Sequence, residues 1–423
     1  MRILTVFLIT SVLFCSCSTN TKIEEPEEEP TQEEPEPIKE VIRPISLLTQ
    51  EMYPLVNRGS DFAIRFFKQV SQERTDDNLF LSPYSLGCAL GMLYNGAEGK
   101  TKEEIATVMA MSDYTPEQLN EYYQTLTKAL IEADQLTELG VANAIWSHTP
   151  YPVKKSFADL MKKYYDAEIS TMDFYLPSSI KAINDWAKEK TKGTIPEVVR
   201  GISPPIILAN AVYFKSPWTV KFNKSNTVDM QFYNGNGVVS TVPIMHQKEL
   251  RLKYAHTSDY EFVQLPYANE TFAMNILLPK EGITLEQVIE SLDGTTWETL
   301  RRTANGSSVD VTLSMPRFKL RDEMDLNNAL IMMGMPRAFT GNAEFLAMLD
   351  VNTRIEGVSQ FSYIDVNEEG TEAAAVTIIR SVILSDLLPP PPKVTMVVDR
   401  PFIFAITEQS TGAILFMGKV VNL

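Results

Sequence analysis

The side chains best suited to acid–base or metal chemistry are three histidines, His148, His246 and His256, which lie far apart in the sequence. A nucleophilic serine would need a motif such as Gly-x-Ser-x-Gly, and the chain has none. It also lacks an HExxH or CxxC metal motif and a phosphate-binding glycine loop. We therefore interpret the histidines as ordinary surface or core residues. The sequence predicts that the chain is not an enzyme and that it holds no metal and no cofactor.

The stretch from Val366 to Lys393 has a pattern of its own. A strand over Tyr363–Val366 leads into Asn367–Gly370, where a chain normally turns back, but no hairpin partner is expected to follow. The next residues alternate with a period of two, as in a strand with one buried face and one wetted face. The small or uncharged set is Thr371, Ala373, Ala375, Thr377, Ile379 and Ser381. The set that holds both charges is Glu372, Ala374, Val376, Ile378 and Arg380.

Four consecutive prolines, Pro389–Pro392, close this stretch and cannot join the interior of a sheet. A segment that could become a central strand is therefore tethered to one that must stay outside. This combination resembles the hinge and reactive-centre loop of the serpin family, with the hinge sequence at Glu368–Ala375. A second signature of that family resembles Arg400–Phe404 and Leu415–Asn422.

The resemblance extends from about Asp61 to Leu423. It implies an α+β fold, the serpin fold, with about eight or nine helices, three β-sheets and an exposed reactive-centre loop over about residues 368–392. In this family a target protease attacks the loop and forms an acyl-enzyme. The loop then inserts into the main sheet as a new strand and traps the protease before water can release it.

The resemblance also implies a position for the attacked bond. The family usually has seventeen residues from the first hinge glutamate to the attacked carbonyl, and Glu368 to Leu384 inclusive is seventeen. The bond is then Leu384–Ser385, with Val382 and Ile383 in neighbouring pockets of the protease. The prolines lengthen the segment after the bond, so counting from the C-terminal side does not fix it, and Arg380 or a one-residue shift stays open.

The residue types at this bond indicate the target class. A large apolar Leu384 suits the primary pocket of an elastase-like, chymotrypsin-like or subtilisin-like serine protease. Ile383 also suits papain-like cysteine proteases, which recognise the residue before the attacked one.

The hinge composition favours an inhibitor. The implied hinge residues are Glu368, Glu369, Gly370, Thr371, Glu372, Ala373, Ala374 and Ala375. The first residues to be buried, Thr371, Ala373 and Ala375, carry no charge and no large side chain. Proline is absent from Gly370 through Ser385, so each residue of this stretch keeps the backbone N–H that a central strand needs. The alternative is a non-inhibitory binding protein or chaperone of the same fold, but such relatives often carry bulky or charged hinge residues.

The region where the family's main sheet opens resembles a small group of residues in this chain. The group comprises Ser82, Pro83, Ser85, Asn210, Gln360 and Trp218. Simple helix capping is the alternative explanation for Ser82 and Ser85, and simple packing is the alternative for Trp218; the flanking family motifs favour the sheet-opening role. The chain departs from the family at Gln360, where many members have a histidine; an amide still donates and accepts hydrogen bonds but does not titrate.

Helices and strands that would position these residues can be read from periodicity and capping signals. Asp61 is expected to cap a first helix. Ser82 and Pro83 should begin a buried helix, and Thr115-Pro116-Glu117-Gln118 should begin another with a capping box. The strand Ile206–Phe214 is apolar along most of its length, so it should be central in a covered sheet.

The N-terminus carries an apolar run, Ile3–Phe14, which is too short to span a membrane and is typical of a signal peptide. We expect cleavage after residue 16 and lipidation of Cys17, because small Ser16 precedes it as in bacterial lipoproteins. Cys15 is a poorer acceptor, since bulky Phe14 precedes it. Ordinary secretion is the alternative. The protein would then lie at the cell envelope or cell surface through its lipid, or in the extracellular space.

Residues 17–45 comprise this cysteine and an acidic tether, and residues 46–423 form the serpin-like domain. Glu and Pro dominate Glu24–Pro37, which cannot bury enough apolar surface to fold. The formal net charge of −16 and the lack of basic blocks argue against nucleic acid as a partner. We expect a monomer that meets a membrane only through its lipid anchor, with Cys88 a buried, inert thiol.

Overall fold

The computed structural model describes residues 43–195, 197, 199, 201, 206–372 and 391–423. The expectations for the signal peptide, Cys17 and the acidic tether lie outside these residues. So do those for Ala373–Ala375, for Val382 and Ile383, and for the bond Leu384–Ser385.

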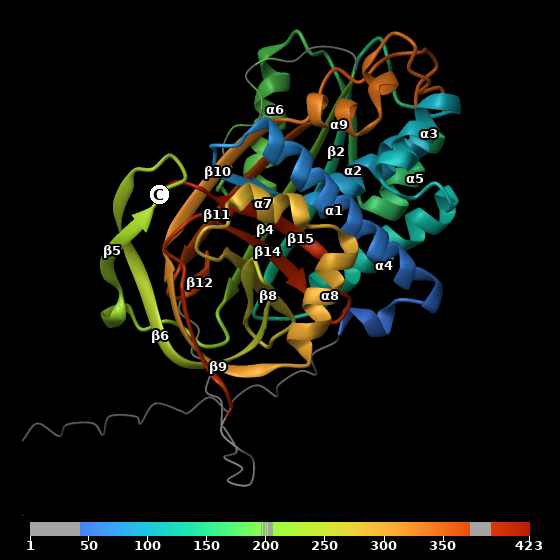
Figure 1. Cartoon of the computed structure of the whole chain (residues 1–423). Helices are drawn as coiled ribbons and strands as arrows, with labels where there is room; N and C mark the ends of the chain where they lie inside the picture. The colour runs from blue at the N-terminus through green and yellow to red at the C-terminus, as the bar shows by residue number, and fades with distance from the viewer. Residues whose placement is uncertain (1–42, 196, 198, 200, 202–205, 373–390) are drawn as a thin grey trace, which may run out of the picture. The chain divides into compact units, whose positions relative to one another are not determined.

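Nine α-helices occur within the described ranges, and the α+β class and the predicted eight or nine helices are confirmed. In Figure 1, α1 to α5 gather on the right of the molecule, and β5 and β6 stand on the left. The helices are α1 Tyr53–Glu73, α2 Pro83–Gly96, α3 Gly99–Val108, α4 Pro116–Glu132, α5 Lys155–Tyr165, α6 Pro177–Lys190, α7 Leu285–Ser291, α8 Gly294–Asn305 and α9 Asn327–Met333. Four short 3-10 helices accompany them: η1 Pro44–Leu47, η2 Gln50–Met52, η3 Lys224–Asn226 and η4 Pro336–Phe339.

One sheet has six strands among the described residues, in the order β10-β11-β12-β4-β2-β3. Its strands are β2 Glu138–His148, β3 Glu168–Met172, β4 Ile206–Pro217, β10 Phe318–Asp325, β11 Ser359–Asn367 and β12 Gly370–Thr371. β4 lies inside the sheet, as its apolar sequence predicts, and pairs along its length with β2.

The other sheet has nine strands in the described part, in the order β1-β15-β14-β8-β7-β6-β9-β13, with β5 paired to β6. The long strand β6 joins its two halves, so the second and third expected sheets are continuous here. The strands are β1 Leu79–Leu81, β5 Val228–Tyr233, β6 Val239–His256, β7 Tyr260–Pro266, β8 Phe272–Pro279, β9 Ser308–Pro316, β13 Lys393–Val397, β14 Phe402–Glu408 and β15 Ile414–Val420.

Helix α2 forms the centre of the molecule, and all of its residues except Asn95 are buried. It begins as predicted: the Ser82 hydroxyl accepts from the Ser85 backbone N–H at 3.4 Å, and Pro83 occupies the first turn. Cys88 is buried in this helix, and burial raises the pKa of its thiol to about 12. A thiol in such surroundings stays protonated and unreactive.

Helix α1 begins earlier than the sequence indicated. It starts at Tyr53, and Asp61 lies in its middle, where the carboxylate pairs with Arg65 one turn later at 2.8 Å. The interpretation of Asp61 as a cap was therefore wrong. The apolar face continues N-terminally through buried Leu55 and Val56, and this packing decides where the helix begins.

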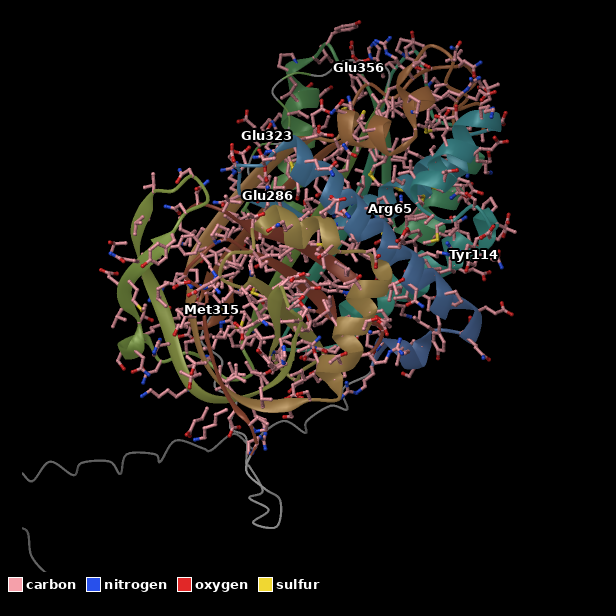
Figure 2. All side chains as sticks on the ribbon, in the orientation of Figure 1. Arg65, Tyr114, Glu286, Met315, Glu323 and Glu356 are labelled. Carbon is pink, nitrogen blue, oxygen red and sulfur yellow. The ribbon has the colours of Figure 1, made fainter. Side chains whose placement is uncertain are left out.

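Charged and apolar side chains separate between the surface and the core in the way expected of a folded domain. Figure 2 shows Glu286 of α7 and Glu323 of β10 directed outward, and both are exposed. Met315 of β9 is fully buried.

The Thr115 capping box at the start of α4 is confirmed, with its side-chain and backbone hydrogen bonds both formed. No helix of the described residues is long and apolar enough to cross a membrane.

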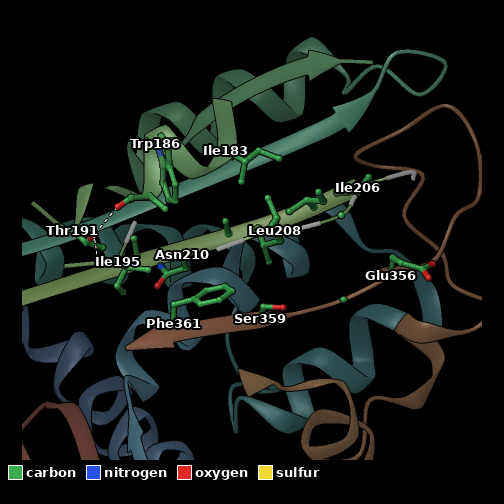
Figure 3. Close-up of a pocket in the computed structure, with 17 residues that line it drawn as sticks. Ile183, Trp186, Thr191, Ile195, Ile206, Leu208, Asn210, Glu356, Ser359 and Phe361 are labelled. Carbon is green, nitrogen blue, oxygen red and sulfur yellow. Dashed lines mark hydrogen bonds between the residues drawn. The ribbon is translucent and has the colours of Figure 1, made fainter. Parts of the chain in front are cut away.

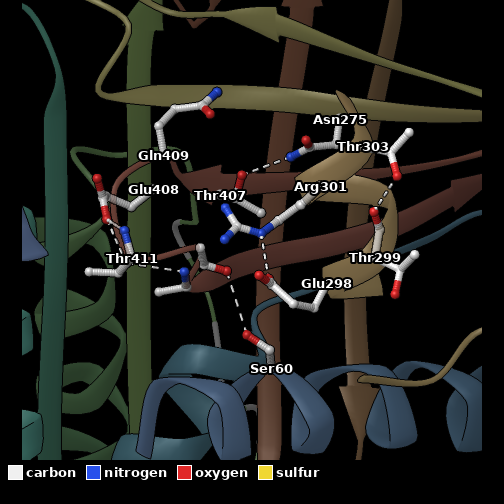
Figure 4. A network of polar contacts seen from close by, with 12 residues as sticks. Ser60, Asn275, Glu298, Thr299, Arg301, Thr303, Thr407, Glu408, Gln409 and Thr411 are labelled. Carbon is white, nitrogen blue, oxygen red and sulfur yellow. Dashed lines mark hydrogen bonds and ion pairs between the residues drawn. The ribbon is translucent and has the colours of Figure 1, made fainter. Parts of the chain in front are cut away.

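A polar network fixes the turn between β14 and β15 against α8 (Figure 4). The Glu408 carboxylate accepts from the backbone N–H groups of Ser410 at 2.6 Å and Thr411 at 2.7 Å. On α8, Arg301 donates to Glu298 at 3.2 Å, and the Arg301 guanidinium lies against Gly412 of the turn. These contacts join the turn of the C-terminal hairpin to α8.

We predict that Gly418→Ala destabilises this hairpin. A Cβ at Gly418 would lie 2.4 Å from the Leu79 carbonyl oxygen of the neighbouring strand, so the backbone would have to shift. We expect the free energy of unfolding to fall by about 1–3 kcal/mol in urea denaturation. The matched control is Gly140→Ala in β2, where the nearest atom is 3.8 Å away; its effect should stay below about 1 kcal/mol. Equal losses in both variants would contradict the packing argument.

Candidate functional site

The hinge residues Gly370 and Thr371 form the short strand β12, which lies between β11 and β4. Thr371 is opposite Val366 of β11 on one side and opposite Ser216 of β4 on the other. A hairpin partner therefore does follow β11, and the expectation that none would follow was wrong. The Asn367 side chain explains the turn, because its oxygen accepts from the Glu369 backbone N–H at 2.9 Å.

Only glycine fits the first position of β12. Gly370 has a φ of 149°, and a Cβ there would lie 2.1 Å from the Ser216 carbonyl oxygen. A side chain would therefore push the hinge out from between its neighbours.

Thr371 faces the core and is 1% exposed. Its hydroxyl lies 2.6 Å from the hydroxyl of Tyr267, so the polar atom is satisfied on burial. Thr371 is the first member of the uncharged set and the only one within the described residues. The small side chain and its partner show how a hinge residue can be buried at this position.

Glu368 is buried as an ion pair. Its carboxylate accepts from the Arg317 Nε at 2.7 Å and also contacts Arg317 Nη2 and the Thr227 hydroxyl. Burial alone would raise the pKa of this carboxyl, but the hydrogen bonds from Arg317 and Thr227 outweigh it and the pKa is lowered. Glu368 thus stays charged and ties the hinge to the start of β10.

Glu369 is held on the other side, by the segment that follows β4. Lys221 and Lys224 approach its carboxylate at 2.8 and 3.0 Å, and their hydrogen bonds lower its pKa. The backbone is held as well, since the Glu369 carbonyl accepts from the Trp218 N–H at 2.9 Å and the Glu368 carbonyl from the Phe222 N–H at 3.0 Å. The two glutamates are therefore anchors of the hinge.

Trp218 lies beside the hinge, directly after the end of β4. It is fully buried and stacks on Tyr267 with ring centroids 4.4 Å apart. Its indole N–H donates to the Asn367 carbonyl at 2.8 Å. Trp218 therefore contacts both the turn of the hinge and the ring that holds Thr371.

Glu372 is the last hinge residue that the structure describes. It points to the opposite face from Thr371, its φ is 50°, and its N–H donates to the Asp365 carbonyl at 2.9 Å. Its pKa is raised to about 7, chiefly by burial and further by the carboxylates of Asp365 and Glu138. A hydrogen bond with Tyr213 and the charge of Lys215 oppose the rise.

Gln360 bonds with Ser82 in both directions. Its side-chain oxygen accepts from the Ser82 N–H and its amide donates to the Ser82 carbonyl, each at 2.9 Å. The Ser82 hydroxyl donates to the Leu415 carbonyl of β15 at 2.9 Å. The amide thus links β11 to the start of α2. Neither ring protonation nor a tautomer is involved, so this link has no titration near neutral pH.

The remaining residues of the expected sheet-opening group do not join this link. The Ser85 hydroxyl is buried without a hydrogen-bond partner within the described ranges. Asn210 of β4 donates to the Asn143 side chain of β2 at 2.6 Å instead. The structure therefore joins Ser82 and Gln360 by hydrogen bonds, with Pro83 and Ser85 following in the first turn of α2, and it places Asn210 within β4 and Trp218 just after the end of β4.

Below the hinge, β4 and β11 run parallel with little pairing. A single isolated bridge joins them, between Leu208 and Val358. A cavity of about 210 Å³ lies along this gap under α6 (Figure 3). In the described part of the six-stranded sheet, the boundary between β4 and β11 therefore has the least backbone pairing, and it continues directly from the hinge strand β12.

Several contact residues of the hinge were missed by sequence reasoning. Arg317, Lys221, Lys224, Tyr267 and Tyr213 come from four different strands or loops, and each is unremarkable in its local sequence. Only the spacing of Lys221 and Lys224 close behind Trp218 offered a signal, as a basic pair near two predicted hinge glutamates.

The three histidines occupy separate places. His148 ends β2 and stacks on Phe174, and His246 and His256 lie on β6. The His246 Nδ1 is 2.7 Å from the Ser314 hydroxyl. Within the described part of the chain, no group of three or more His, Cys, Asp or Glu residues could hold a metal ion.

Comparisons with known proteins agree with this arrangement. The family model described as Serpin (serine protease inhibitor) matches residues 57–423. An uncharacterized serpin-like protein of Thermococcus kodakarensis is 33% identical over 380 residues, covering 87% of this chain and 86% of its own. The leukocyte elastase inhibitor of Xenopus laevis is 33% identical over 391 residues, covering 87% and 99%.

Among solved structures, the thermophilic serpin tengpin in its native state matches with a TM-score of 0.78 and 30% identity. The match covers 89% of this chain and 95% of tengpin. Sequence and structure therefore agree over nearly the whole described part, and the chain belongs to the serpin family.

Proposed function

We propose that the chain is a suicide-substrate inhibitor that traps an endopeptidase by inserting its cleaved loop between β4 and β11. The observation that carries this proposal is the position of β12, which is hydrogen-bonded between these two strands. This position supports the proposal, because an inserted loop would extend β12 between the same two strands. The non-inhibitory alternative, a binding protein or chaperone, gives no reason for a hinge placed in this way.

Insertion competes with hydrolysis of the acyl-enzyme, so its barrier decides the outcome. Opening the sheet below the hinge would break few backbone hydrogen bonds, because within the described residues β4 and β11 share a single bridge, Leu208–Val358. An inserted strand would gain bonds on both of its edges, and each is worth about 0.5–1.5 kcal/mol net. The balance therefore favours insertion once the loop is cut.

The proposed target and location rest on the residue types at the expected bond and at the N-terminus. The attacked bond is Leu384–Ser385, and the target is an elastase-, chymotrypsin- or subtilisin-like serine protease, with a papain-like cysteine protease as the second choice. The chain acts as a monomer. Lipid on Cys17 and the acidic tether hold it at the cell envelope or surface, and release by ordinary secretion would place it in the extracellular space.

The inhibitor proposal is tested with Thr371→Arg. The arginine would have to bury a charge where the Thr371 hydroxyl now meets Tyr267, so the hinge should be expelled and insertion slowed. We expect wild-type chain to form a complex with chymotrypsin or elastase that survives SDS, and the variant to be cleaved with little complex. Thr371→Ser keeps the hydroxyl and serves as the control. An unchanged stoichiometry of inhibition in Thr371→Arg would count against insertion.

The attacked bond is tested by mass spectrometry of the short C-terminal fragment released in the same reaction. We expect a fragment that begins at Ser385 and ends at Leu423. Leu384→Asp should abolish cleavage there, because a hydrophobic primary pocket does not accept a carboxylate. A fragment beginning at Ser381 would show instead that Arg380 is attacked.

The raised pKa of Glu372 predicts that hinge docking depends on pH. The docked state holds a proton on Glu372 up to about pH 7, whereas a solvated glutamate loses it near about 4.3. Docking is therefore fully stabilised below about pH 4.3 and loses stability as the pH rises to about 7. We expect Trp218 fluorescence, which reports on the neighbouring turn, to change over this range.

Two glutamine variants separate the hinge glutamates in this titration. Glu372→Gln should remove the change in Trp218 fluorescence, because the amide stays neutral at every pH. Glu369→Gln should keep the change, because the pKa of Glu369 is lowered and not raised. The explanation fails if the two variants titrate alike.

A further inference from the structure

The loop between α4 and β2, residues 133–137, contains a buried carboxylate. It belongs to Asp134, whose Oδ1 accepts from the Leu136 backbone N–H at 2.9 Å and closes a turn within the loop. The other bonds come from Asn269, in the turn between β7 and β8. The Asn269 backbone N–H donates to Oδ2 at 3.0 Å, and its side-chain amide donates to Oδ1 at 3.1 Å. Asp134 therefore holds a turn that lies 135 residues further along the chain.

The β7–β8 turn needs such a hold, because its backbone is strained. Ala268 has a φ of 42° and Glu270 has a φ of 67°, and neither is a glycine. Residues with a Cβ adopt this left-handed region only at a cost in free energy. The turn is also held from a second side, where the Thr219 hydroxyl donates to the Ala268 carbonyl at 2.9 Å. Asp134 and Thr219 thus fix the backbone that directly follows Tyr267.

Tyr267 joins this turn to the hinge. Its backbone N–H donates to the Phe272 carbonyl across the turn at 2.9 Å. Its ring stacks on Trp218, and its hydroxyl lies 2.6 Å from the Thr371 hydroxyl. A tyrosine side chain in a packed core keeps its rotamer, so the hydroxyl moves with the backbone. A shift of about 1 Å in the turn would take this hydroxyl out of hydrogen-bond range of Thr371.

A second arm of the same loop reaches the strand beside Thr371. The Thr137 hydroxyl lies 2.7 Å from the Ser216 hydroxyl, and both side chains are buried. Ser216 is the residue of β4 that pairs with Thr371. Within the loop, the Thr137 N–H donates to the Asp134 carbonyl at 3.1 Å, so the two arms are joined. The loop therefore contacts Ser216 directly and Tyr267 through its turn.

We propose that the α4–β2 loop positions the hinge, with Asp134 and Thr137 as its positioning residues. The first acts through the β7–β8 turn and Tyr267, and the second acts through Ser216. The inference rests on the proposed function, because a docked hinge is where insertion would begin. Loss of either arm should free the hinge without unfolding the domain. Fewer attacked loops would then insert before the acyl-enzyme is hydrolysed.

The test is hydrogen exchange of the hinge amides in the whole chain, measured by mass spectrometry below the Glu372 pKa of about 7. The Glu372 N–H donates to the Asp365 carbonyl, so its exchange reports on docking. Asp134→Asn keeps the shape of the side chain but has one oxygen in place of two, so at least one of the three bonds is lost. Because the lost bond is to a charged group, we expect the hinge amides to exchange about tenfold faster.

Variants of the second arm test the same proposal without changing Asp134. Thr137→Val removes the hydroxyl and should also speed hinge exchange, whereas Thr137→Ser keeps it and should exchange like wild type. Gly418→Ala is the control for general destabilisation, because its clash is with β1, and its hinge amides should exchange like wild type. The proposal is overturned if Asp134→Asn and Thr137→Val exchange at the wild-type rate, or if Gly418→Ala speeds the hinge amides as much as they do.

The link to inhibition is measured separately, as the stoichiometry of inhibition of chymotrypsin or elastase. It should rise in Asp134→Asn and Thr137→Val and stay unchanged in Thr137→Ser. Faster hinge exchange with an unchanged stoichiometry would refute this link. If the wild-type chain traps no protease, the proposed function fails, but the exchange rates still decide whether the loop positions the hinge.

Discussion

The pairing of β4 with β11 is the constraint on which the rest of the molecule depends. These strands are parallel neighbours in the middle of the six-stranded sheet, yet one bridge and the two-residue strand β12 hold them together. Strands on either side are fully paired, β4 with β2 and β11 with β10. Among the described residues, the line between β4 and β11 is therefore the most weakly paired part of this sheet, and fully paired strands flank it on both sides.

The hinge residues divide two opposing tasks between them. Glu368 and Glu369 are charged, hydrogen-bonded and tied to Arg317, Lys221 and Lys224, so they fix where the loop leaves the sheet. Gly370 has no side chain and lies where a Cβ would clash with β4, and Thr371 has a small side chain that packs against Tyr267. The anchored glutamates and the two residues buried between the strands thus follow each other within four residues, so the proposed insertion would not require the anchors to be released.

The family resemblance implied the fold class and the helix count. Periodicity and capping, which are local signals, predicted the caps of α2 and α4 and the central place of β4. The sequence missed the start of α1, which packing of Leu55 and Val56 decides. It identified the hinge glutamates, but their partners were out of reach, since Arg317 and Lys221 are far away in the sequence. At Asn367 nothing in the sequence indicated that a hairpin partner follows, because a two-residue strand leaves no periodic pattern.

The two faces of the hinge obey different electrostatics, and this explains why a carboxylate is tolerated beside a residue that must be buried. Thr371 faces the core, where a charge would be desolvated without a partner. Glu372 faces the side of α6, where Tyr213 and Lys215 offer partners and protonation offers a neutral form. The outward face of an inserted strand would continue over the cavity lined by Trp186. The α6 side of the sheet can therefore hold a neutral Glu372 at the hinge and is mostly apolar further along. A strand with small residues on one face and mixed residues on the other would fit both of these stretches.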